Sequence, residues 1–222
     1  MNLKFILALV VGTLVMASVM LICRKWYSIS IIRILICSVL LTVSGLISVS
    51  VMYFIENWQF GGLSFFGGVF FVPLFMLPVS RLVSVNGIDL IDLSAPSVSA
   101  MLAVMKVQCL RDGCCKGRVL CISEAGNIVR FPSQIVELIS GLVIMTVLIS
   151  LMNNEKNRGK IYPYFLIIYG CVRFALNWLR ETTPFVWILP AGNFWSIIAI
   201  IIGVLWIAVF NRKKVRTTVH MI

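Results

Sequence analysis

A stripe of polar side chains runs through an apolar segment in the last third of the chain. Tyr169, Arg173, Asn177 and Arg180 recur at intervals of four, four and three residues, which places them on one face of an α-helix. A guanidinium among apolar neighbours is costly unless a counter-charge or a wet cavity receives it. The stripe therefore predicts an inward-facing surface on which Arg173 binds an anionic group. The alternative is an internal ion pair, with Glu137 as the partner.

A second segment, residues 106–131, combines basic residues with closely spaced cysteines, namely Cys109, Cys114, Cys115 and Cys121. A zinc site is disfavoured, because an adjacent cysteine pair fits a tetrahedral site less naturally than two separated Cys-x-x-Cys knuckles, and no histidine lies nearby. In an oxidising compartment the same thiols could form disulfides, for example Cys109 or Cys121 with one of the pair.

The third possibility for these cysteines is a reactive thiolate. Cys114 is followed by Lys116 and Arg118, and neighbouring positive charge lowers the pKa of a thiol. Cys114 would then act as a nucleophile or a base. Lys106 is a second candidate base, if burial lowers the pKa of its ammonium group.

The composition places these residues in a membrane protein. Of 222 residues, 60% are hydrophobic and 12% are charged, which is too apolar for a water-soluble domain of this length. Apolar runs long enough to cross the hydrocarbon core as helices lie at residues 5–22, 31–55, 65–79, 90–107, 135–152, 162–178 and 194–210. We therefore expect an all-α integral membrane protein, with residues 1–222 forming one transmembrane helical-bundle domain of seven transmembrane helices.

The distribution of basic residues predicts the orientation of the bundle. Short loops with Lys and Arg stay on the cytoplasmic side, and alternation puts most of them on one side: Arg24, Lys25, Arg81, Lys156, Arg158, Lys160 and the basic tail at residues 211–222. The N-terminus is then outside and the C-terminus cytoplasmic. The net charge of +11 favours contact with anionic membrane lipid over nucleic acid, since no basic soluble domain is present.

One group of basic residues departs from this rule. It falls on the outer face, within or near residues 106–131, and consists of Arg111, Lys116, Arg118, Arg130 and Arg180. Positive charge kept against a topological preference indicates a functional surface. The alternative is a solvated rim that contacts lipid phosphates. The span at residues 90–107 contains several polar residues, so we expect it to be surrounded by protein.

Five short motifs occur in an order that is similar to that of a known family. They are GGLSFFGG at residues 61–68, DLSAP at 92–96, the segment 106–118, RFPSQIVE at 130–137 and the stripe that starts with YGCVRF at 169. Together they resemble the signatures of bacterial prolipoprotein diacylglyceryl transferases, and the match extends from the third span onward.

This resemblance implies an enzyme of lipoprotein biosynthesis in the bacterial plasma (inner) membrane, a multi-pass protein. Members transfer a diacylglyceryl group from phosphatidylglycerol to the lipobox cysteine thiol of a prolipoprotein and release glycerol phosphate. The expected partners are phosphatidylglycerol, the lipobox cysteine and membrane lipid; neither a cofactor nor a metal is expected.

The resemblance also implies roles for individual residues. Arg173 and Arg180 would hold the phosphate leaving group, and with Lys106 and Cys114 they form the expected catalytic set. The expected substrate-binding residues are Gly67, Gly68, Arg118, Ser133, Gln134, Glu137, Tyr169 and Asn177.

The chain departs from the family at its acid–base positions. Phe66 replaces the signature histidine, Cys109 replaces an asparagine, Lys106 replaces an arginine, and Cys114 and Asn177 replace glutamates. General-base assistance is worth about 100- to 10,000-fold. Two alternatives therefore stay open: a catalytically impaired phospholipid-binding relative, and a membrane thiol-redox protein that uses the cysteines of residues 109–121.

Overall fold

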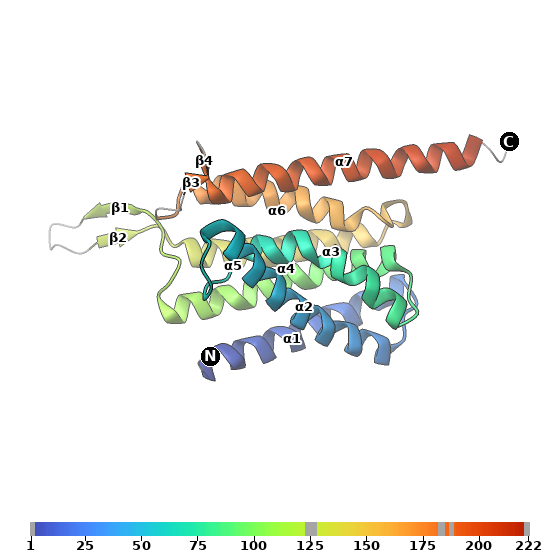
Figure 1. Ribbon diagram of the computed structural model, residues 1–222, viewed down its shortest axis with the longest axis horizontal. Coiled ribbons are helices and arrows are strands. Elements are labelled where there is room, and N and C mark those ends of the chain that lie inside the picture. The colour runs from blue at the N-terminus through green and yellow to red at the C-terminus, as the bar shows by residue number, and fades with distance from the viewer. Residues whose placement is uncertain (1–2, 123–127, 182–184, 187–188, 220–222) are drawn as a thin grey trace.

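The computed structural model describes residues 3–122, 128–181, 185–186 and 189–219. In these ranges the chain forms seven α-helices (Figure 1): α1 Leu3–Cys23, α2 Ile31–Asn57, α3 Phe65–Leu82, α4 Gly87–Asp112, α5 Ser133–Met152, α6 Ile161–Asn177 and α7 Ala191–Val219. Each expected span falls on one of these helices. All of them except α6, which has 17 residues, are long and apolar enough to cross a membrane. The prediction of an all-α membrane protein is thus confirmed for the bundle.

The structure adds two small antiparallel hairpins that the sequence did not predict. Strand β1 (Val119–Ile122) pairs with β2 (Ile128–Arg130), and β3 (Phe185–Val186) pairs with β4 (Leu189–Pro190). Both hairpins lie at the end of the bundle that also holds the first residues of α1, whereas the chain ends at the opposite end (Figure 1). We call these the hairpin end and the far end.

The two special segments expected from the sequence are described only in part. Residues 123–127 of the segment 106–131 and residues 220–222 of the basic tail lie outside the described residues. The described portion of the first segment comprises the end of α4, a cysteine-containing loop and the β1–β2 hairpin. The backbone of the tail continues α7 as far as Val219.

Helix α4 is the core of the bundle, as its polar composition predicted. In its most apolar stretch 78% of residues are buried, against 22–39% in the other long helices. It packs against α1, α3, α5 and α6. Its hydroxyl side chains do not need outside partners, because Ser94, Ser97 and Ser99 donate to carbonyl groups of the preceding turn of the same helix.

Small residues allow the close packing around this core. A Cβ atom on Gly67 of α3 would lie 2.0 Å from the Ser48 carbonyl oxygen of α2, and one on Gly141 of α5 would lie 3.0 Å from the Ser99 carbonyl oxygen of α4. The backbones of these helix pairs therefore approach to a distance that only glycine permits. Gly67 therefore permits the close packing of α3 on α2, and Gly141 permits that of α5 on α4.

A second polar network joins helices at the far end. The Asp92 carboxylate of α4 accepts hydrogen bonds from the backbone N–H groups of Gly159, Ile161 and Tyr162 at 2.5, 3.1 and 3.2 Å. These N–H groups lie at the start of α6, where a helix has unpaired donors and the positive end of its dipole. Asp92 thus caps α6 from another helix, so this part of the DLSAP motif holds the fold together away from the hairpin end.

Candidate functional site

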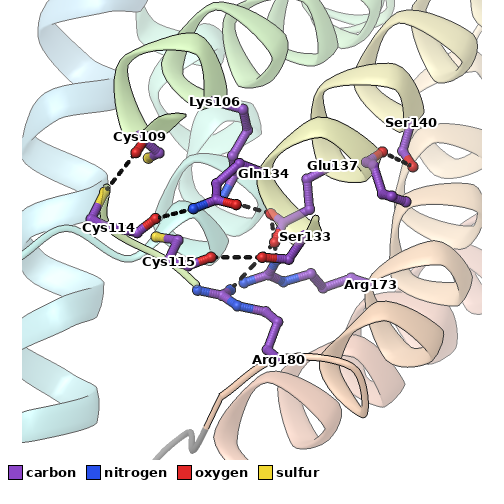
Figure 2. Close-up of polar contacts among 11 residues, drawn as sticks. Lys106, Cys109, Cys114, Cys115, Ser133, Gln134, Glu137, Ser140, Arg173 and Arg180 are labelled. Atoms are coloured by element: carbon purple, nitrogen blue, oxygen red, sulfur yellow. Dashed lines mark hydrogen bonds and ion pairs between the residues drawn. The ribbon is translucent and has the colours of Figure 1, made fainter. Parts of the chain in front are cut away.

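The charged stripe of α6 converges on a single buried carboxylate at the hairpin end (Figure 2). Glu137, in the first turns of α5, is 4% exposed. Its Oε2 atom lies 2.6 Å from Lys106 Nζ and 2.6 Å from Arg173 Nη1, and its Oε1 atom lies 3.7 Å from Arg180 Nη1. We call these four residues the Glu137 cluster. It brings together side chains from α4, α5, α6 and the turn after α6.

The Glu137 cluster carries more positive than negative charge. Three cations surround one carboxylate, so its four groups sum to +3 − 1 = +2. The cationic side chains of Lys106, Arg173 and Arg180 are only 10–15% exposed, so water screens this excess weakly. Among the described residues, Arg173 Nε has no hydrogen-bond partner. An anion that entered the cluster would be stabilised by charge and by an unused donor.

The space beside Arg173 is small on the side that faces α5 and α6. A cavity lined by Glu137, Ser140, Tyr169 and Arg173 has a volume of about 10 Å³, which is room for about one water molecule. The internal ion pair between Arg173 and Glu137, given above as the alternative, is therefore formed. A larger anion would have to approach the cluster from the side of Lys106, which lines a second cavity.

That side opens on a larger, apolar cavity of about 220 Å³ between α1, α2, α3 and α4. Its walls include Met16, Leu41 and Val72, and its polar end is formed by Lys106, Cys109 and Cys115. A hydrocarbon wall that ends in a cation suits an amphipathic ligand with an apolar body and an anionic head.

The cysteines lie beside this polar end in a fixed loop, which we call the cysteine loop (residues 113–117). Helix α4 ends at Gly113 with a φ of 65°, and Cys115 has a φ of 56°. The Ser133 hydroxyl donates to the Cys115 carbonyl oxygen at 2.7 Å, and Gln134 Nε2 donates to the Cys114 carbonyl oxygen at 2.7 Å (Figure 2). Ser133 and Gln134 therefore position the loop.

The loop is also joined to the end of α6. Gly117 forms a β-bridge with Arg180, and the Arg118 N–H donates to the Leu179 carbonyl oxygen at 2.9 Å. Backbone hydrogen bonds thus join the cysteine loop to the turn that carries Arg180.

The thiols of Cys109, Cys114 and Cys115 converge, with their sulfur atoms all within 4.8 Å of one another. All seven cysteines are free thiols. A hydrogen bond from Cys109, together with the charges of Lys106 and Arg180, lowers the pKa of Cys115 to about 5 against the effect of burial. Burial raises the pKa of Cys114. The thiol with the lowered pKa is thus Cys115. The prediction that Lys116 and Arg118 lower the pKa of Cys114 is wrong, because these exposed side chains do not determine that pKa.

Other expected site residues lie near the Glu137 cluster but make different contacts. Tyr169 is 3% exposed, and the centroid of its ring lies 5.8 Å from the centroid of the Phe66 ring. Asn177 Nδ2 donates to Asn193 Oδ1 of α7 at 2.6 Å, so it joins α6 to α7. The Arg118 side chain is exposed.

The two glycines of the third helix also differ in their surroundings. Gly67 packs on the backbone of α2, whereas Gly68 lines the apolar cavity. Gly68 thus lies where a ligand would pass.

The sequence argument missed one acidic residue. Glu56, in the last turn of α2, interacts electrostatically with Arg173 and lies beside Ser64. The span expected at residues 31–55 ends one residue before it. A lone carboxylate at the end of a span on the same face as the basic residues was the signal that could have identified it.

Comparisons with known proteins are consistent across the chain. The family described as prolipoprotein diacylglyceryl transferase matches residues 2–209.

Three proteins named phosphatidylglycerol–prolipoprotein diacylglyceryl transferase are similar to this chain. That of Teredinibacter turnerae is 32% identical over 167 residues, which cover 69% of this chain and 58% of the relative. That of Paracidovorax citrulli is 30% identical over 170 residues, with 71% and 63% covered. That of Francisella tularensis subsp. novicida is 30% identical over 179 residues, with 74% and 65% covered. The aligned part of the chain spans less than two thirds of the length of these relatives.

Proposed function

Because the chain belongs to the prolipoprotein diacylglyceryl transferase family, we propose that it transfers a diacylglyceryl group from phosphatidylglycerol to a cysteine thiol of a prolipoprotein. The observation that carries this proposal is the Glu137 cluster, whose four groups sum to +2 and whose Lys106 lines the polar end of an apolar cavity. The charged cluster fits the phosphate head of the lipid, and the apolar cavity fits its hydrocarbon part.

The charge of the Glu137 cluster suits the leaving group of the reaction. The phosphodiester of phosphatidylglycerol carries one negative charge, and the glycerol phosphate that leaves carries about two. The cations therefore stabilise the transition state more than the bound lipid, which is the requirement for catalysis. Glu137 holds Lys106, Arg173 and Arg180 in place before the lipid arrives, so little reorganisation is needed when charge develops.

The remaining expected site residues have supporting roles in this proposal. Gly68 lines the cavity that takes the apolar part of the lipid. Ser133 and Gln134 hold the cysteine loop against the cavity. Tyr169 and Asn177 shape α6, and Arg118 lies exposed where the acceptor peptide would arrive.

We extend the proposal to the membrane topology. All seven helices cross the bacterial plasma membrane, with the N-terminus and the hairpin end outside. Its support is the concentration of basic residues at the far end, among them Arg24, Arg81 and Lys156, since such residues stay on the cytoplasmic side. A membrane-impermeant maleimide added to whole spheroplasts should label the exposed Cys121 of β1; protection of Cys121 until the membrane is opened would refute this orientation.

The decisive experiment measures turnover. Purified protein is incubated with labelled phosphatidylglycerol and a lipobox peptide, and the thioether product is quantified. Arg173→Ala should lower the rate by more than about 100-fold, because a preorganised charge at the leaving group is lost. Arg173→Lys should have an intermediate rate, because lysine keeps the positive charge but cannot form the bidentate hydrogen bonds of a guanidinium group. Arg33→Gln, an exposed arginine at the far end, is the control and should match the wild type.

Each result decides between the functions. Thioether formation that depends on Arg173 supports the transferase. Stabilisation by phosphatidylglycerol vesicles without any product supports instead a lipid-binding relative, an alternative that the buried, apolar Phe66 at the position of the family's histidine favours. Equal turnover by Arg173→Ala and wild type would refute the role given to the Glu137 cluster.

A further inference from the structure

The proposed reaction needs a thiolate, and the usual proton acceptor is absent from its position. A free cysteine thiol has a pKa of about 8.5, and only its thiolate is a good nucleophile. Phe66 replaces the family's histidine and is 4% exposed, packed between aromatic rings. Lys106 is an ammonium that donates to Glu137. Neither offers a lone pair to the acceptor.

The three converging thiols provide another way to ionise the acceptor. The sulfur atoms of Cys109, Cys114 and Cys115 lie within 4.8 Å of one another. In a tetrahedral zinc site with Zn–S bonds of about 2.3 Å, ligand sulfurs lie about 3.8 Å apart. Movements of about 1 Å would bring the present thiols to that spacing.

The loop conformation removes the objection that an adjacent pair cannot share a metal. Cys115 has a left-handed backbone with a φ of 56°, which turns its side chain relative to that of Cys114. The Cys114 N–H donates to the Cys109 carbonyl oxygen at 3.1 Å, and this bond folds the loop back over the end of α4. A non-glycine residue in this conformation is uncommon and is maintained only where the surroundings require it.

The electrostatic setting also suits a metal bound by three thiolates. Zn(II) with three thiolates has a net charge of −1, and Lys106 and Arg180 lie close enough to Cys115 to offset it. Cys109 and Cys115 line the polar end of the apolar cavity. A metal held there would be next to the place where the lipid head binds in the proposed function.

We propose that Cys109, Cys114 and Cys115 bind one Zn(II) ion and that its fourth position takes the acceptor cysteine. A zinc site with three protein ligands and one open position is the catalytic type, and a thiol that coordinates zinc is deprotonated. This inference rests on the proposed transferase function for its chemistry, whereas metal binding itself does not.

The proposed step transfers the glycerol carbon from the phosphate oxygen to the acceptor sulfur. The acceptor thiol binds the metal and releases its proton to water. Its sulfur attacks the glycerol carbon that is esterified to phosphate, so a C–S bond forms while the C–O bond breaks. The electron pair of that bond leaves on the phosphate oxygen, and the Glu137 cluster holds the resulting glycerol phosphate.

Metal binding is tested on the full-length protein in detergent under reducing conditions. Mass spectrometry of the metal content should find about one Zn(II) per chain. Replacement by Co(II) should give the intense sulfur-to-metal absorption and the visible bands of a tetrahedral site. Cys109→Ser and Cys115→Ser should each lose the metal and these bands. Cys171→Ser, an exposed thiol on α6, and Cys121→Ser on β1 are matched controls that should keep both.

A second measurement separates lost metal from lost fold. Binding to phosphatidylglycerol vesicles should be retained in chelator-treated wild type. Thioether formation should be lost in Cys115→Ser and in chelator-treated wild type, and it should return to the treated wild type with added Zn(II). A metal content near zero, a Co(II) spectrum that survives both Cys109→Ser and Cys115→Ser, or a disulfide among the three cysteines of protein isolated without oxidation would overturn the site. Stoichiometric zinc in a protein that neither binds nor consumes phosphatidylglycerol would leave the site intact and refute the proposed function.

Discussion

The two ends of the bundle use buried charge in opposite ways. At the far end, Asp92 accepts three backbone N–H groups and the Tyr27 hydroxyl, and Asp89 pairs with Arg158 at 2.5 Å. At the hairpin end, the Glu137 carboxylate pairs with three cations. Acceptors and donors are matched in the first network, whereas positive charge exceeds negative charge in the second.

This difference is the one expected between a structural network and the proposed binding site. The Asp92 network joins α4 to the start of α6 and needs no further group. Burial and the neighbouring carboxylates raise the pKa of Tyr27, so its hydroxyl stays a neutral donor across the physiological range. The Glu137 cluster retains an unpartnered donor, Arg173 Nε, among the described residues. Substitutions at the two ends should therefore have different consequences for stability and for ligand binding.

Asp92→Ala should have the largest effect on stability. It leaves three N–H groups at the start of α6 without an acceptor, which costs about 4 kcal/mol or more at about 1–3 kcal/mol per buried group. The thermal unfolding midpoint in micelles should fall steeply, and phosphatidylglycerol should not restore it. Glu155→Gln, an exposed carboxylate at the same end, serves as the control. An unchanged midpoint in Asp92→Ala would contradict the structural role of this network.

Glu137→Gln should cost about 3 kcal/mol, because three cations lose their counter-ion while the shape of the side chain is kept. Here an anion should help: phosphatidylglycerol or inorganic phosphate should raise the unfolding midpoint of the variant more than that of the wild type. The comparison with Asp92→Ala is then direct, since only one of the two losses is reversed by an anion. Failure of both anions to stabilise Glu137→Gln would argue against a phosphate site.

Lys106→Met should weaken binding of phosphatidylglycerol vesicles by about tenfold, which corresponds to about 1.4 kcal/mol. The reason is that the substitution lowers the net charge of the cluster from +2 to +1 while keeping the length of the side chain. Lys156→Met removes an exposed lysine at the far end and should leave binding unchanged. Equal weakening by both substitutions would indicate a general attraction to anionic membranes.

Arg158→Gln should have the smallest effect. The Arg158 side chain is 54% exposed whereas its partner Asp89 is 8% exposed, so we expect a loss of about 1 kcal/mol, the upper limit for exposed ion pairs. Unfolding in micelles should shift only slightly and lipid turnover should stay at the wild-type rate. A loss of turnover in this variant would show that the far end takes part in the reaction.

The sequence predicted much of the fold because the membrane restricts the possibilities. Apolar runs must become helices to satisfy their backbone groups, so all seven helices were predicted within about five residues of their bounds, except that α7 continues nine residues beyond its expected end. The polar residues of α4 identified it as the core helix. The spacing of Arg173 and Arg180 predicted a shared inward face, and Glu137 was named as the possible partner.

The structural details that determine the chemistry could not be predicted from the sequence. The left-handed backbone at Cys115, and hence the convergence of three sulfurs, depends on hydrogen bonds from Ser133 and Gln134, which are distant in sequence. Asn177 shares the spacing of the stripe but bonds to α7 instead, because the last turn of a helix has several neighbours. Spacing identifies a face, whereas three-dimensional packing selects the partner on that face.

The bridge between Gly117 and Arg180 bears on the order of events in a two-substrate reaction. In the proposed reaction, a peptide that displaces the cysteine loop would also shift Arg180, since the two segments share backbone hydrogen bonds. Binding of the acceptor and binding of the lipid donor would then be coupled through this contact. We expect the affinity for each substrate to depend on whether the other is present, a cooperativity that would require no motion of the surrounding helices.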